Sequence, residues 1–245
     1  MRFLRWLITR LGRPGASIWV IGFALALASP SLMSPLIADD LIHVVKIDPA
    51  QPIASLGAPE TPYFVFADGT PEQRAALMDE GMFSWWTAEG FKLAFWRPIS
   101  QASHELDDVL FAENSVLIHL HSLLWFVLIL LALSRLYERF HVPRVAVLAL
   151  CIYGLDDARG MVLSFASNRN ALIAVFFSVC VLIAHDRWRR DGWRAGAFLG
   201  PLMLVTALLS GEIAIAATAY LFAYALFIDE HTLKQSALSL LPYAA

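Results

Sequence analysis

The sequence predicts an all-α polytopic membrane protein with about six transmembrane helices and a long first extracytoplasmic loop. Composition is the first reason: 58% of the 245 residues are hydrophobic and only 16% are charged, whereas soluble domains carry about 25% charged residues. The mean hydropathy is +0.61. So few charges could not cover a soluble fold of this length, but they suffice where the outer surface faces lipid.

Alternation of apolar blocks with short charged segments is the second reason. The first block is long enough to cross a hydrocarbon core of about 30 Å. The blocks comprise residues 16–38, 115–134, 145–155, 171–184, 195–210 and 213–228. The prediction is therefore a cytoplasmic tail over 1–15, a first transmembrane helix over 16–38, an extracytoplasmic loop over 39–114, and five further spans within 115–245.

Basic residues predict the orientation, because Lys and Arg in short loops stay on the cytoplasmic side. They cluster before the first block, after the second, and after the fourth, at Arg2, Arg5, Arg10, Arg13, Arg135, Arg139, Arg144, Arg187, Arg189, Arg190 and Arg194. A cytoplasmic N-terminus puts all three clusters on one side. The loop over 39–114, with 13 acidic and four basic residues, then lies outside.

A cleaved signal peptide is the alternative for the first block, since a basic stretch precedes an apolar one. The block is long for a signal peptide, and Pro30 and Pro35 lie near its end, so an uncleaved anchor is favoured. The two cysteines, Cys151 and Cys180, fall inside apolar runs and are interpreted as small buried hydrophobes. A net charge of −3 gives no indication of a nucleic-acid partner.

The long loop has a mixed character. Residues 49–71 are rich in Pro, Gly and small side chains and should be irregular, whereas 72–81 could form a short helix. The aromatic stretch 83–95 is typical of segments that lie at the headgroup level. We therefore expect part of this loop to rest on the membrane surface.

An acidic pair, Asp39-Asp40, directly follows the first block. Adjacent carboxylates repel, so one of them holds its proton to a higher pH than an isolated Asp. A group that titrates closer to neutrality suits a general base. The alternative, that the two acids merely mark the end of a span, stays open on spacing alone.

Three further charged residues lie near the predicted outer surface. Pro98 holds Arg97 in extended geometry at the start of a helix, where the guanidinium could bind a phosphate or pair with the acidic loop. Arg169 stands at the beginning of an apolar helix, so it either snorkels or meets an anion. Glu212 lies at a tight turn and could face solvent or pair with Arg97 or Arg169.

Histidines and carboxylates are concentrated between residues 104 and 121, but they show no compact metal-ligand spacing. No metal site and no cofactor is therefore predicted. His119 and His121 begin the second block, and residues two apart do not share a helix face. At most one of the two can face a site.

Taken together, these segments resemble the GT-C class of membrane glycosyltransferases, and more narrowly its protein O-mannosyltransferase branch and bacterial relatives. The resemblance rests on the acidic pair after the first span, on Trp96-Arg97-Pro98-Ile99, on His119-Leu120-His121, on Ser167-Asn168-Arg169-Asn170-Ala171-Leu172, and on Leu209-Ser210-Gly211-Glu212. Gly211 stands where the family turn has Lys, which puts a lysine–phosphate contact in doubt.

The resemblance implies transfer of a sugar from a polyprenyl-phosphate donor to an acceptor hydroxyl, on the outer side of the bacterial inner membrane. Asp39 or Asp40 would be the base. Arg97, Arg169, His119, His121 and Glu212 would line the substrate site. Enzymes of this class usually have about twice as many spans, so the chain is expected to match their front half, as a fragment or a shortened relative.

A non-catalytic membrane subunit or a small-molecule carrier is the competing function. A carrier would place ionisable residues within broken helices at mid-span, whereas here they concentrate at the outer ends. A subunit predicts no convergence of Asp39, Asp40, Arg97, Arg169 and Glu212. A transferase predicts that they gather around one outward-facing cleft.

Overall fold

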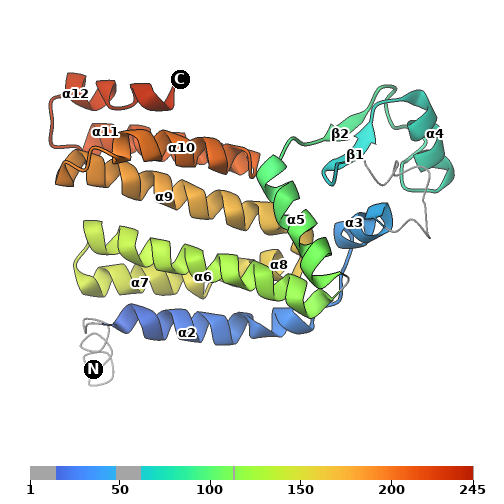
Figure 1. Cartoon of the computed structure of the whole chain (residues 1–245), viewed down its shortest axis with the longest axis horizontal. Coiled ribbons are helices and arrows are strands. Elements are labelled where there is room, and N and C mark those ends of the chain that lie inside the picture. Colours follow the sequence, from blue (N-terminus) through green and yellow to red (C-terminus); the bar gives the residue numbers. More distant parts are fainter. Residues whose placement is uncertain (1–14, 48–61, 113, 245) are drawn as a thin grey trace.

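The protein is mostly helical in a computed structural model that describes residues 15–47, 62–112 and 114–244 (Figure 1). The helices are α2 (Ala16–Ala28), η1 (Ser29–Met33), α3 (Asp39–Ile47), α4 (Pro71–Asp79), α5 (Pro98–Phe111), α6 (Ser115–Phe140), α7 (Pro143–Gly154), α8 (Ala158–Ser164), η3 (Ala166–Asn168), α9 (Arg169–Asp191), α10 (Gly196–Leu208), η4 (Glu212–Ile215), α11 (Ala216–Phe227), α12 (Leu233–Leu238) and η5 (Leu241–Tyr243).

Three helical stretches in the described part are long and apolar enough to cross a membrane: Ala16–Met33, Ser115–Phe140 and Ala166–Asp191. The remaining apolar helices, α7, α10 and η4–α11, are shorter. At 1.5 Å per residue, a helix of 12 or 13 residues is only about 20 Å long, less than a hydrocarbon core of about 30 Å. The structure thus gives a helical membrane protein with three full-length candidate spans.

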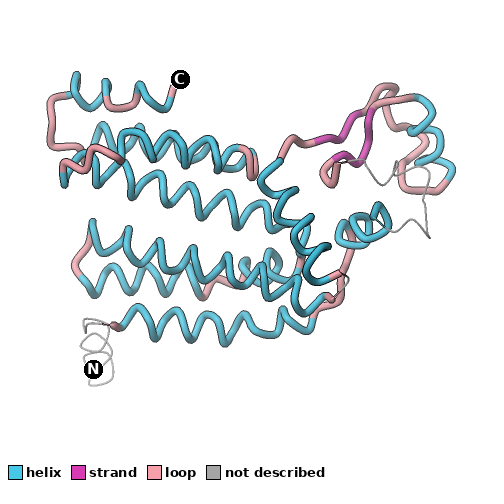
Figure 2. The backbone as a smooth tube through the Cα atoms, viewed as in Figure 1, coloured by secondary structure: helices cyan, strands magenta, loops and turns pink. Residues whose placement is uncertain are grey.

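The apolar helices run side by side (Figures 1 and 2), and two main clusters of buried side chains lie between them. The larger cluster joins α2, α6, α7 and α9 and includes the fully buried Ile129, Leu130 and Leu150. The smaller joins α9 to α10 and α11 through Val181, Leu204 and Leu221. Many large apolar side chains remain exposed on the outer faces of these helices, as expected of surfaces in contact with lipid.

The first apolar block ends earlier than predicted. Helix α2 stops at Ala28, η1 continues to Met33, and the backbone becomes extended at Ser34. Pro30 and Pro35 explain this, because proline lacks an N–H and disfavours helix in the residue before it. The acidic pair therefore does not end the span: it opens a separate helix, α3.

The segment between α3 and α5 contains a small folded unit. Two short strands, β1 (Val65–Asp68) and β2 (Lys92–Ala94), pair antiparallel, so the predicted irregular stretch over 49–71 includes a strand. Residues 48–61 of that prediction lie outside the described residues. The predicted helix over 72–81 corresponds to α4, whose first turn is capped by the Thr70 side chain accepting from the Gln73 N–H.

The two ends of the helix bundle carry different segments. Figure 1 shows the start of α2, the α6–α7 connection and α12 at one end, and α3, α5, α4 and the strand pair at the other. We call the first the basic end, defined by residues 135–144, 186–194 and 229–234, which hold eight basic and five acidic residues. The other is the acidic end.

Helix α10 packs closely on α9 through small residues. A Cβ added at Gly196 would overlap the Ala184 carbonyl oxygen and would lie 2.8 Å from the Trp188 Cβ. Four residues on, Gly200 faces the Tyr243 ring. Gly196 thus lets α9 and α10 approach closely, and Gly200 leaves room for the Tyr243 side chain of η5.

Gly196→Ala is expected to lower the free energy of unfolding by about 1–3 kcal/mol, because the added methyl group forces α9 and α10 apart. Thermal unfolding in detergent, followed by tryptophan fluorescence, measures the change. Gly22→Ala is the matched control, since a Cβ there meets no atom within 4 Å. Equal melting temperatures for the two variants would contradict this account of the α9–α10 contact.

Candidate functional site

Asp40 links α3 to η3, the segment before α9, by hydrogen bonds. Its carboxylate accepts from the Ser167 N–H at 2.7 Å, the Ser167 hydroxyl, the Ala166 N–H at 3.4 Å and the Ile37 N–H at 3.2 Å. Only 3% of the residue is exposed. A carboxylate offers about four lone-pair positions, so all of them are occupied by donors of the protein itself.

Arg169 is fully buried at the start of α9 and forms the densest polar cluster of the acidic end. Its guanidinium pairs with Asp107 and donates to the Ile118 carbonyl oxygen at 2.8 Å. It also donates to the Ser122 hydroxyl at 3.0 Å and the Ser103 hydroxyl at 3.4 Å. These bonds join α9 to α5 and α6, and they satisfy a cation that lipid would not tolerate alone.

The two histidines of α6 have different surroundings, as their spacing predicts. His121 Nδ1 lies 2.6 Å from Asp107 Oδ1, and the Trp125 indole N–H donates to His121 Nε2 at 3.2 Å. Nε2 is thus an acceptor and Nδ1 carries the proton. His119 is fully buried, and neither of its ring nitrogens has a hydrogen-bond partner in the described part of the chain.

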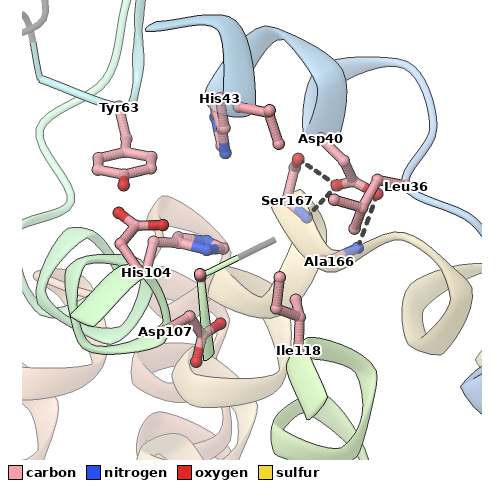
Figure 3. Close-up of a pocket in the computed structure, with 12 residues that line it drawn as sticks. Leu36, Asp40, His43, Tyr63, His104, Asp107, Ile118, Ala166 and Ser167 are labelled. Carbon is pink, nitrogen blue, oxygen red and sulfur yellow. Dashed lines mark hydrogen bonds between the residues drawn. The ribbon is translucent and has the colours of Figure 1, made fainter. Parts of the chain in front are cut away.

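A small polar cavity lies between α3, α5, α6 and η3 (Figure 3). Asp40, His43, His104, Asp107 and Ser167 are on its wall, and its volume of about 40 Å³ leaves room for small groups such as a water or a hydroxymethyl arm. Within the described residues, no group of three His, Cys, Asp or Glu side chains is arranged to hold a metal ion.

Burial shifts the titration of several groups around this cavity. It lowers the pKa of His104 well below its usual value, with neighbouring Arg169 acting in the same direction, so the ring is neutral at pH 7. Burial raises the pKa of Asp108, a cavity residue, to about 6. The pKa of Asp39 is also raised, first by burial and then by the Asp40 charge.

Arg97 does not enter this cavity. Its guanidinium pairs with Glu212 through Nη2–Oε2 at 2.7 Å and Nε–Oε2 at 2.9 Å, and it lies over the Phe95 ring at 4.3 Å. The Ile99 N–H donates to the Leu209 carbonyl oxygen at 3.2 Å nearby. The pair therefore joins the start of α5 to the α10–η4 turn.

An apolar groove begins beside the polar cluster. It has a volume of about 660 Å³ and is lined from α2, α5 and α6, by Leu25, Leu106, Phe111, Leu117, Leu120, His121, Leu123, Leu124 and Val127. His121 is its polar residue, and Leu106, Leu120 and Leu124 are about half exposed. The groove therefore opens on the lipid-facing surface of the bundle and touches the Asp107–Arg169 cluster at His121.

The residues predicted from sequence thus fall into two neighbouring groups. Asp40, His121 and Arg169 belong to the cavity and its supporting cluster, whereas Arg97 and Glu212 form a separate pair. Asp39 opens α3 next to Asp40, and His119 is buried in α6.

Sequence reasoning did not assign site roles to Asp107, Asp108 or His104. Their signal is present in the sequence as a polar face on α5: Ser100, Ser103, His104 and Asp107 recur at helical spacing, and all are buried.

Comparison of the chain with protein-family models, with curated proteins and with solved structures gives no match. The interpretation of the site therefore rests on its own residues.

Asp107→Asn is expected to lower the free energy of unfolding by about 3–5 kcal/mol, because it leaves the Arg169 charge buried without a carboxylate partner. Thermal unfolding of the purified variant measures the loss. Asp157→Asn removes an exposed acid at the same end and is the control. A melting temperature equal to that of the control would show that the pair does not stabilise the fold.

The raised pKa of Asp108 predicts that the free energy of unfolding decreases as pH rises. Its folded-state pKa of about 6 lies above the unfolded value of 3.8, so the native state holds the extra proton and stability falls as pH rises from about 4 to 6. Asp108→Asn should remove the loss of stability that follows ionisation of Asp108. The variant should therefore melt at a higher temperature than wild type above pH 6. Melting curves of both proteins between pH 4 and 8 provide the test, and parallel pH profiles would contradict it.

Proposed function

We propose that this protein is a membrane glycosyltransferase of the GT-C type, which moves a sugar from a polyprenyl-phosphate donor to an acceptor hydroxyl at the acidic end. The observation that carries the proposal is convergence. The start of α3, the polar face of α5, the start of α6 and η3 meet around one cavity, whereas Arg97 and Glu212 pair outside it. A transferase requires such a meeting of polar elements, and a purely structural subunit does not.

A carboxylate of α3 would act as the base on the acceptor hydroxyl. Asp40 lines the cavity, but four donors occupy its oxygens. Asp39 has no such bonds among the described contacts, and its pKa is raised. We therefore assign proton abstraction to Asp39 and the placement of α3 to Asp40.

The donor would use the apolar groove and its polar boundary. A polyprenyl chain suits a groove whose walls are almost entirely leucine and phenylalanine. The phosphate, which leaves as an anion, needs donors or cations nearby. His121 lies at the groove, but its Nδ1 faces Asp107 and its Nε2 accepts from Trp125. The hydrogen-bond donor to the phosphate would therefore be Arg97, which lies outside the groove and would have to exchange Glu212, whose side chain is 56% exposed, for the phosphate.

Membrane topology supports the same proposal. We propose six spans in the bacterial inner membrane with the N-terminus in the cytoplasm, so that the basic end faces the cytoplasm and the cavity faces outward. The excess of Arg at the α6–α7 and α9–α10 connections fits this orientation. The shorter helices would complete their spans with flanking residues and local thinning of the bilayer.

A non-catalytic membrane subunit is the second candidate, and one observation favours it. Both cations expected to hold the phosphate are already paired with carboxylates of the protein, Arg169 with Asp107 and Arg97 with Glu212. A subunit would need these pairs for structure alone. An enzyme would have to break the Arg97–Glu212 pair to bind the phosphate at Arg97.

Transfer from a polyprenyl-phosphate sugar, assayed with purified protein in liposomes, distinguishes the two. Asp39→Asn should lower kcat by about 10²- to 10⁴-fold, the usual contribution of a general base, without a change in melting temperature. Asp40→Asn should lower activity and melting temperature together, since an amide cannot accept from all four donors. Asp157→Asn should do neither. Full activity of the Asp39 variant would refute the assignment, and a wild-type protein without transfer would favour the subunit.

A further inference from the structure

A second and larger groove runs along the bundle from η4 to the basic end. It has a volume of about 960 Å³ and is bounded by α6, α7, α9 and the η4–α11 segment. Its walls run along α11 from Ile213 to Ile228, a length of roughly 20 Å at 1.5 Å per residue. One leaflet of hydrocarbon is about 15 Å thick, half of a core of about 30 Å, so the groove can hold the acyl chain of one leaflet along its whole length.

The walls change character along this groove. Over most of the length they are aliphatic or small, including Val175, Val179 and Ala216. At the basic end they include Arg139, Arg190 and His141 against the single acid Glu230. Tyrosine side chains also line the groove, at positions 137, 153, 220 and 224. An apolar trough with a cationic end has the chemistry of a lipid tail followed by an anionic headgroup.

Two arginines line the groove, and the protein orients both of them. Arg139 pairs with Asp186 and, at 2.9 Å, with Asp191. Arg190 donates to the Arg139 carbonyl oxygen at 3.0 Å and lies 3.6 Å from Asp186, yet its side chain is 40% exposed. Arg190 is therefore oriented by the protein while part of its guanidinium stays available to a ligand.

We infer that this groove binds one anionic phospholipid, with an acyl chain along α11 and the phosphate at Arg190. Charge complementarity chooses this occupant: the three segments of the basic end hold eight basic and five acidic residues, and basic pockets between membrane helices bind anionic headgroups. A lipid with no net charge could fill the same trough, but it would bring no net negative charge to Arg190. The site is independent of the proposed transferase reaction and lies outside its residues.

The test is native mass spectrometry of the full chain, released from detergent after addition of phosphatidylglycerol or phosphatidylcholine. Wild-type protein should retain phosphatidylglycerol at one site, and Arg190→Gln should weaken that binding roughly fivefold, the effect of one basic residue near an anionic headgroup. Arg194→Gln is the matched control, because Arg194 is an exposed arginine of the same connection that does not line the groove.

A second pair of variants tests the trough without altering charge. Ala216→Phe fills the groove, whereas Ala219→Phe places the same side chain on α11 outside the residues that line it. Loss of phosphatidylglycerol in the first alone supports the proposal. Equal retention of the two lipids, no effect of Arg190→Gln and Ala216→Phe in proteins that melt normally, or a dimer that buries the groove and excludes lipid would each overturn it.

Discussion

The buried pair between Arg169 and Asp107 is the interaction on which the acidic end depends. A guanidinium with no exposed surface at the start of a membrane helix is stable only if every donor finds an oxygen, and here the oxygens come from α5 and α6. The pair thereby determines where α5 crosses the end of the bundle. Because Asp107 also accepts the Nδ1–H of His121, the same carboxylate sets the tautomer and orientation of the histidine at the apolar groove.

Asp40 has a related role on the other side of the cavity. Its bonds to the Ala166 and Ser167 N–H groups attach α3 to the segment that leads into α9. Two carboxylates on the cavity wall, Asp40 and Asp107, thus each bond to neighbouring elements, whereas burial raises the pKa of Asp108 and of Asp39.

The two ends of the molecule differ in how their charged side chains are paired. At the acidic end, Arg169 pairs with Asp107 in the interior and Arg97 pairs with Glu212, and the polar cluster touches an apolar groove at His121. At the basic end, cations exceed anions and Arg190 stays partly exposed beside a longer groove. Closed pairs stabilise and orient, whereas a partly open cation at the end of an apolar trough can recognise an anionic lipid.

Composition and periodicity in the sequence determined that the chain is a helical membrane protein, where its apolar helices lie, and which segments carry like charge, because these depend on local hydrophobicity and on the basic clusters. The predicted first helix over 16–38 was too long, because Pro30 and Pro35 end it at Met33. The sequence could not decide that Arg169 meets Asp107, that Asp40 is saturated by backbone N–H groups, or that two strands pair within the long loop. Those outcomes depend on contacts between residues at least 24 positions apart. Burial, the largest cause of the pKa shifts of Asp108 and His104, exists only once the helices have packed.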